Sequence, residues 1–150
     1  MSNEQISYKN ILKEYSWIVE KRQKYILSPD SDGFLCGLLV TNYLGGEIVG
    51  FYDGKIALIK NGVKPQDCIF LDVDINRKEI KSVGHHIVTY NKRITHKNIN
   101  YSDCIQPNIL RNFDGRNDFQ KKYPFSTAHL LLGIFQEAKL INKLPKDAIW

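Results

Sequence analysis

Carboxylates and imidazoles, two kinds of side chain that bind metal ions, occur in three short groups of this sequence. Asp30 and Asp32 stand one residue apart in a turn-forming stretch, Asp72 follows the apolar run Cys-Ile-Phe-Leu, and His85 and His86 are adjacent. Carboxylates brought together repel one another unless a positive charge lies between them. Carboxylates combined with imidazoles suit Mn²⁺, Fe²⁺, Co²⁺ or Zn²⁺. Two such ions, about 3.5–4 Å apart, activate a water and clamp a phosphoryl group, so these residue types point to phosphoryl chemistry.

Each group also has a purely structural interpretation. The stretch from Asp30 to Gly33 is compatible with a turn in which Asp32 caps the following helix. The segment 72–74 is compatible with a solvated strand end, and adjacent histidines are commonly incidental. The conjunction is stronger than any single group, because all three fall at the ends of predicted strands. Asp74 is a lesser candidate.

Alternating strands and helices predict a fold that would bring the three groups together. Short apolar strands separated by helices indicate a single α/β domain with a mostly parallel sheet and helices on both faces. Ligands bind at the carboxyl ends of the strands in such sheets. The two histidines precede a predicted strand and need a loop that returns them to this edge. We expect strands at 25–27, 47–52, 55–59, 68–71 and 86–90, helices at 8–22, 33–43, 76–83 and 126–140, and an irregular polar segment at 91–124.

The composition is that of an ordinary globular protein. The chain has 150 residues, 43% of them hydrophobic and 25% charged, and no run approaches the roughly 18 apolar residues of a membrane span. With a polar N-terminus, this predicts a cytoplasmic protein. Cys36, Cys68 and Cys104 are far apart, which favours free thiols over disulfides or a zinc site. The net charge of +5 suits an anionic partner, although a solvated surface explains it equally well.

The order of these groups resembles the DHH phosphoesterase superfamily. That superfamily includes type II inorganic pyrophosphatases, oligoribonucleases, cyclic-dinucleotide phosphodiesterases and single-strand exonucleases, and the resemblance spans roughly residues 24–90. It implies Mn²⁺ or another divalent metal as cofactor. Asp30 and Asp32 look like the first metal ligands, Asp72 like a bridging ligand, His85 like a further ligand and His86 like a phosphate contact. These five residues are the candidate catalytic residues.

The sequence departs from the family pattern at three places. Ile26 and Ser28 stand where a further upstream ligand is expected, and Gly84 stands where an aspartate usually precedes the two histidines. The family also has an aspartate after a Ser/Thr-rich helix start, followed by a separate C-terminal substrate domain. Two accounts fit these departures: the 150 residues lack a C-terminal domain or partner subunit, or the chain is a small divergent member with an altered site. Asp114, Asp118 and Asp147 are the acidic residues available for the missing position.

Two functions from different classes follow. The first is a metal-dependent phosphoesterase acting on phosphodiester or phosphate bonds of nucleotides or short oligonucleotides. The alternative is a catalytically degenerate module of the same fold that binds a nucleotide or nucleic acid. A haloacid dehalogenase-type phosphotransferase ranks lower, because the histidine pair has no role in it. Basic residues within 91–122 could attract the anionic substrate: Lys92, Arg93, Lys97, Arg111, Arg116, Lys121 and Lys122.

Overall fold

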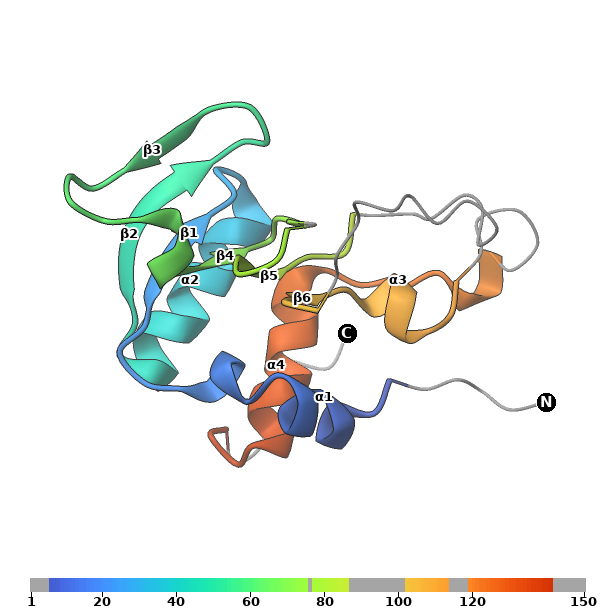
Figure 1. The fold of residues 1–150 in the computed structure, drawn as a ribbon. Helices are drawn as coiled ribbons and strands as arrows, with labels where there is room; N and C mark the ends of the chain where they lie inside the picture. Colours follow the sequence, from blue (N-terminus) through green and yellow to red (C-terminus); the bar gives the residue numbers. More distant parts are fainter. Residues whose placement is uncertain (1–5, 76, 87–101, 114–118, 142–150) are drawn as a thin grey trace.

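The computed structural model describes residues 6–75, 77–86, 102–113 and 119–141. A six-stranded sheet with the order β3-β2-β1-β4-β5-β6 forms its centre (Figure 1). Every neighbouring pair is parallel except β2 with β3. The predicted α/β class with a mostly parallel sheet is therefore confirmed. The strands are β1 (Lys24–Leu27), β2 (Glu47–Tyr52), β3 (Ala57–Ile59), β4 (Cys68–Leu71), β5 (Lys81–Val83) and β6 (Cys104–Ile105).

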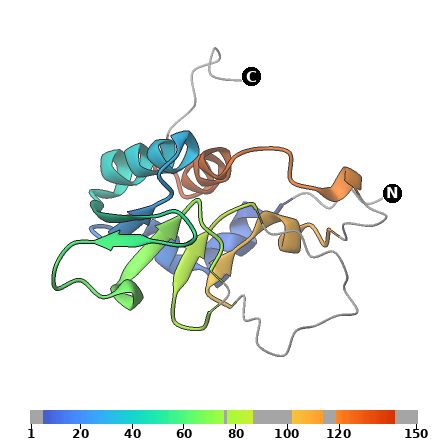
Figure 2. The same cartoon turned by 90° about the horizontal axis from the view of Figure 1, so that it is seen from above.

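Two helices lie side by side on one face of this sheet (Figure 2). They are α2 (Ser31–Leu44) and α4 (Thr127–Glu137). The remaining helical elements are short. The single helix predicted for residues 8–22 is divided into α1 and a 3₁₀ turn, η1. The short elements are α1 (Tyr8–Glu14), η1 (Ser16–Val19), η2 (Pro65–Asp67), α3 (Pro107–Leu110) and η3 (Phe119–Lys121).

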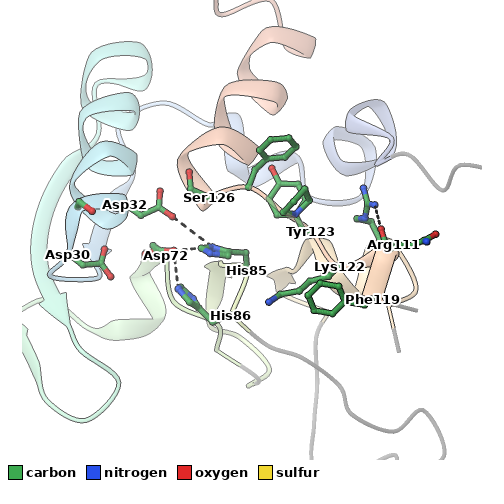
Figure 3. A pocket seen from close by; sticks show the side chains of 14 residues that line it. Asp30, Asp32, Asp72, His85, His86, Arg111, Phe119, Lys122, Tyr123 and Ser126 are labelled. Carbon is green, nitrogen blue, oxygen red and sulfur yellow. Dashed lines mark hydrogen bonds and ion pairs between the residues drawn. The ribbon is translucent and has the colours of Figure 1, made fainter. Parts of the chain in front are cut away.

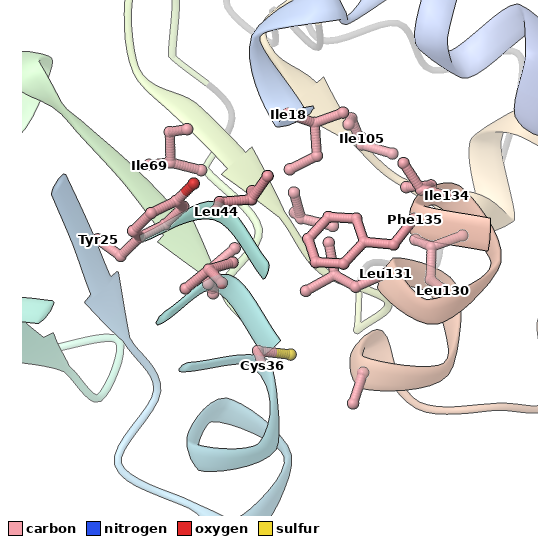
Figure 4. Close-up of a cluster of buried hydrophobic side chains, with 14 of the residues drawn as sticks. Ile18, Tyr25, Cys36, Leu44, Ile69, Ile105, Leu130, Leu131, Ile134 and Phe135 are labelled. Carbon is pink, nitrogen blue, oxygen red and sulfur yellow. The ribbon is translucent and has the colours of Figure 1, made fainter. Parts of the chain in front are cut away.

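Side-chain alternation along the strands builds two apolar clusters, one on each face of the sheet. On β1, Tyr25 and Leu27 join the larger cluster, while Ile26 joins the smaller one. The larger cluster packs α1, α2 and α4 against the sheet, with Leu131 and Phe135 of α4 fully buried (Figure 4). In the described ranges, the smaller cluster consists of strand and loop side chains. The helices therefore fix the position of one face of the strands, and with it the loops at their ends.

Helix α2 begins at a tight turn directly after β1. The side chain of Asp30 accepts a hydrogen bond from the backbone N–H of Gly33 at 2.9 Å and caps the helix. Gly33 is packed so closely that a Cβ at this position would overlap the backbone carbonyl of Ser28. At the other end Gly45, with φ of 63°, adopts the left-handed conformation typical of a helix C-cap. The turn thus requires a small residue three positions after its capping carboxylate.

One predicted helix is a strand in the structure. Residues 77–80 form a turn, and 81–83 form β5, paired with β4 and β6. Charged helix-forming residues and the spacing of Ile80 and Val83 favour a helix locally, but the sheet edge that β4 offers overrides this preference. The segment predicted to be irregular also contains β6, α3 and η3. Apart from His86, the predicted strand at 86–90 lies outside the described residues.

No helix in the described part of the chain combines the length and apolar character needed to cross a membrane.

The tight turn before α2 gives a first prediction. Gly33→Ala should lower the free energy of unfolding by about 1–3 kcal/mol, as other overpacked interiors do, because the added methyl group overlaps a backbone atom that is held by the turn. Urea denaturation measures this change. Ser31→Ala, at an exposed position of the same turn, is the control and should change stability by less than about 0.5 kcal/mol. Equal midpoints for the two variants would contradict the close packing at Gly33.

Candidate metal centre

The structure brings all five candidate residues to one pocket of about 870 Å³. Figure 3 shows three aspartates on one side of this pocket, with the two histidines beside them. Each group follows one of three neighbouring parallel strands, β1, β4 and β5. The sequence pattern did not predict β5, which ends at Val83 with a single residue between it and the histidines. The histidines therefore reach this edge of the sheet directly and need no returning loop. The lining includes Asp30, Asp32, Asp72, His85 and His86.

Asp72 is the most buried of these groups. Its residue is only 3% exposed, and its φ of 59° is a left-handed value that aspartate tolerates better than most residues. One oxygen, Oδ1, accepts a hydrogen bond from the Thr127 hydroxyl at 2.6 Å. The other, Oδ2, is buried and receives no hydrogen bond from the described residues. Burial raises the pKa of Asp72, although hydrogen bonds from His85 and Thr127 oppose this.

Both histidine rings approach the same carboxylate. Nδ1 of His85 lies 3.4 Å from Oδ1 of Asp72, and Nε2 of His86 lies 3.7 Å from it. Asp72, His85 and His86 each offer one ligand atom within 4.8 Å of the others. Asp32 extends the group, since its Oδ2 lies 3.8 Å from Nδ1 of His85. A buried carboxylate oxygen without a donor, beside two imidazoles and a further carboxylate, fits a divalent cation of the Mn²⁺ or Zn²⁺ type.

The first aspartate pair combines structural and candidate functional roles. Asp30 caps α2 and accepts a hydrogen bond from the Ser28 hydroxyl at 2.8 Å. Burial acts to raise the pKa of Asp30, but the hydrogen bonds from Gly33 and Ser28 outweigh it and lower the pKa. Asp32 does not cap its own helix. Instead it accepts hydrogen bonds from the backbone N–H groups of Thr127 at 2.8 Å and of Ala128 at 2.9 Å. It thus joins the start of α4 to the site.

Thr127 is a functional candidate that the sequence analysis did not identify. Its hydroxyl donates to Asp72 and lies 2.7 Å from Nδ1 of His85. Thr127 therefore contacts both Asp72 and His85 through one hydroxyl group. The signal that could have identified Thr127 is its position as the first residue of α4, directly after the capping residue Ser126.

Asp74 places a carboxylate beside the histidine pair. Its Oδ2 accepts the backbone N–H of His86 at 2.8 Å and lies 3.4 Å from Nδ1 of the same ring. A Cβ on Gly84 would overlap the carboxylate of Asp74, so the two positions share one volume. The hydrogen bond to Asp74 raises the pKa of His86, and burial opposes it. Gln106 holds the other oxygen of Asp74 at 3.0 Å.

The remaining sequence departures also have places in the fold. Ile26 is fully buried in the smaller cluster, and Ser28 binds Asp30, so neither faces the pocket as a ligand. Among the basic residues expected to attract substrate, Arg111 and Lys122 line the pocket. Lys121 lies between two lining residues in the sequence but is not itself part of the lining. The acidic residues Asp114, Asp118 and Asp147 lie outside the described residues, as do the basic residues Lys92, Arg93, Lys97 and Arg116.

Comparisons with protein-family models, with curated proteins and with solved structures find no match for this chain. The pocket is therefore interpreted from its own geometry.

The buried Oδ2 of Asp72, without a donor among the described residues, gives a second prediction. Asp72→Asn should raise the free energy of unfolding of the metal-free protein by about 1 kcal/mol near neutral pH, because it removes a buried charge that lacks a full set of donors. The gain should shrink on acidification, since the raised pKa means that the wild-type carboxyl is neutralised first in the folded state. Thermal denaturation at a series of pH values measures both effects.

With Mn²⁺ present, Asp72→Asn should lose the stability advantage that it has over wild type in the metal-free protein. Wild type should gain about 2.7 kcal/mol of stability at a Mn²⁺ concentration of 100 times its dissociation constant, and Asp72→Asn should gain far less. Asp67→Asn, an exposed carboxylate outside the pocket, is the control and should keep the full Mn²⁺ effect. A Mn²⁺ effect that survives in Asp72→Asn would exclude this residue as a ligand.

The shared volume of Asp74 and Gly84 gives a third prediction. Asp74→Gly removes the carboxylate that holds His86, the candidate phosphate contact, and should lower Mn²⁺-dependent hydrolysis of a phosphate diester about 10- to 100-fold, as the loss of an orienting partner does. Gly84→Asp should also be harmful, because its side chain overlaps Asp74. The double variant should recover much of the loss, since it moves one carboxylate from one strand end to the next. Rates of bis-p-nitrophenyl phosphate hydrolysis with Mn²⁺ for all four proteins form a double-mutant cycle, and purely additive losses would contradict the exchange.

Proposed function

We propose that this chain is a metal-dependent phosphoesterase of the DHH type, with a divergent arrangement of its carboxylates. The buried Oδ2 of Asp72, which receives no hydrogen bond from the residues that the structure describes, is the observation that supports this proposal. A carboxylate is expensive to bury without donors, and two histidines and two further aspartates lie around the same pocket. An arrangement with this cost is expected where it serves a bound cation.

Asp30, Asp32, Asp72 and His85 are the residues that would hold Mn²⁺ or a similar divalent ion. Such an ion supplies Lewis-acid polarisation of a phosphoryl oxygen and an activated water at neutral pH. The protein contributes orientation: Thr127 fixes Asp72 and His85, while two backbone N–H groups of α4 fix Asp32. Each ligand is thus held by a second contact before any ion binds.

His86 is suited to contact the substrate. Its ring is half-exposed and lies against that of His85, with ring centres 4.3 Å apart. Asp74 and Asp72 face it and favour its protonated form, so it can donate hydrogen bonds to a phosphoryl oxygen. A cationic donor at the mouth of a site rich in carboxylates also reduces the repulsion that an anionic substrate meets.

The second candidate function is a binding module without catalysis. It is favoured by Ile26 and Ser28, which leave the centre without an upstream ligand because one is buried elsewhere and the other binds Asp30. In this case nucleotides should bind while Mn²⁺ produces no turnover.

The proposed substrate is a nucleotide or a short oligonucleotide, and a further domain or a partner subunit is the proposed source of additional contacts. The positive net charge and the pocket residues Arg111 and Lys122 support an anionic substrate. The three cysteines are free thiols, which supports a reducing, cytoplasmic location.

Hydrolysis assays test the proposal. With Mn²⁺, the protein should cleave bis-p-nitrophenyl phosphate and dinucleotides, and chelation should abolish the activity. Asp72→Asn should reduce turnover at least 100-fold, as expected when an ion-holding carboxylate is lost, whereas the surface variant Asp67→Asn should match wild type. Equal background rates in all three proteins would exclude catalysis by this chain, and nucleotide binding without turnover would favour the binding module.

A further inference from the structure

Aromatic side chains form the wall of the pocket that lies opposite the aspartates. Phe119, Tyr123 and Phe125 all line it, together with Lys122. Phe119 is 76% exposed and Phe125 is 48% exposed, whereas Tyr123 is buried. Exposed rings in a pocket bury little apolar surface in the fold. Their place beside a candidate phosphoryl site calls for a ligand with a flat apolar part.

Phe125 is held in a defined orientation despite its exposure. Its ring stacks on His129, with ring centres 4.3 Å apart and planes inclined by 20°. Tyr123 packs edge-on against Phe125 at 5.8 Å, and its hydroxyl lies 3.1 Å from Nδ1 of His129. Because His129 belongs to α4, the same helix whose first turn binds Asp32, the ring is carried by an element already anchored at the metal centre.

A second connection fixes the distance between the aromatic wall and the histidines. The side chain of Asn108 donates to the backbone carbonyl of His85 at 2.9 Å and accepts the backbone N–H of Tyr123 at 2.7 Å. Asn108 is itself buried. The loop that carries the histidines and the segment that carries the aromatic rings are therefore joined through one side chain. This geometry is prepared before any ligand enters, which reduces the ordering cost of binding.

The wall also carries the positive charge that a phosphate needs. Lys122 lies over the ring of Phe119, with its ammonium nitrogen 5.5 Å from the ring centre, and Figure 3 shows it extending toward the histidines. Arg111 donates to the backbone carbonyls of Lys121 and Gln120, at 2.6 and 3.4 Å, and so supports the turn that presents Phe119 and Lys122. Stacking surfaces interleaved with basic groups are the means by which proteins hold single-stranded nucleotides.

We infer that the aromatic wall is a nucleobase-binding subsite, in which Phe125 stacks on a base while Lys122 binds an adjoining phosphate. This inference rests on the proposed function for the position of the scissile phosphate, and it adds the substrate class: the ligand is a single-stranded nucleotide with an unpaired base, and simple phosphates are poor ligands. Since every base has a flat face, the subsite selects for the presence of a base and tolerates its identity.

Calorimetry with two matched ligands tests this subsite. The ligands are 5′-phosphorylated dithymidylate and its abasic analogue, in which hydrogen replaces both bases, each titrated without metal and with Mn²⁺. Wild type should bind the dinucleotide about 5- to 100-fold more tightly than the abasic analogue, the range expected for one stacked base. Phe125→Leu should abolish this preference without weakening the abasic ligand, and Phe125→Trp should keep it.

Phe34→Leu is the matched control, because Phe34 is 53% exposed but lies outside the pocket. It should keep the full preference, and thermal denaturation confirms that each variant is folded. No preference in wild type, or equal losses for both ligands in Phe125→Leu, would overturn the subsite. A base preference without Mn²⁺-dependent hydrolysis would overturn the phosphoesterase proposal and leave the subsite standing. Mn²⁺-dependent hydrolysis without a base preference would overturn the subsite and leave the phosphoesterase proposal standing.

Discussion

The buried carboxylate of Asp72 is the constraint around which the rest of the site is arranged. It lies at the end of a central strand in a left-handed conformation, with one oxygen bound by Thr127 and the other without a donor from the described residues. Holding an anion there without solvation is costly. The structure limits this cost from three sides, through the Thr127 hydroxyl and the rings of His85 and His86. These contacts join Asp72 to the loop after β5 and to the first turn of α4.

Much of this arrangement could be predicted from the sequence because it depends on chain order and on local pattern. Asp30 and Asp32 follow a short apolar strand and precede a helix, and parallel strands place such turns at one edge. The position of the histidines was predicted less well. The short strand 81–83 is not distinguished by composition, since Lys81 and Ser82 are polar and only pairing on both sides makes them a strand. Partners such as Asn108 and Gln106 were not foreseen, because their contacts join segments far apart in the chain.

Asp74 shows how residues on separate loops can share one position in space. The carboxylate beside His86 belongs to the loop that follows β4, and the glycine at position 84 leaves the space that it fills. What the chemistry requires is a charge at a point in space, and two adjacent strand ends can each deliver it.

The hydrogen bonds from Thr127 and Ala128 to Asp32 also make the site visible to spectroscopy. These two backbone amides belong to the first turn of α4, and both point at one carboxylate. The resonance position of an amide proton depends strongly on the charge of its acceptor. Any ion that draws electron density from Asp32 should therefore move the signals of residues 127 and 128 together, while amides near the end of α4 remain still. The fold thus contains its own pair of reporter nuclei for ion binding at the candidate metal centre.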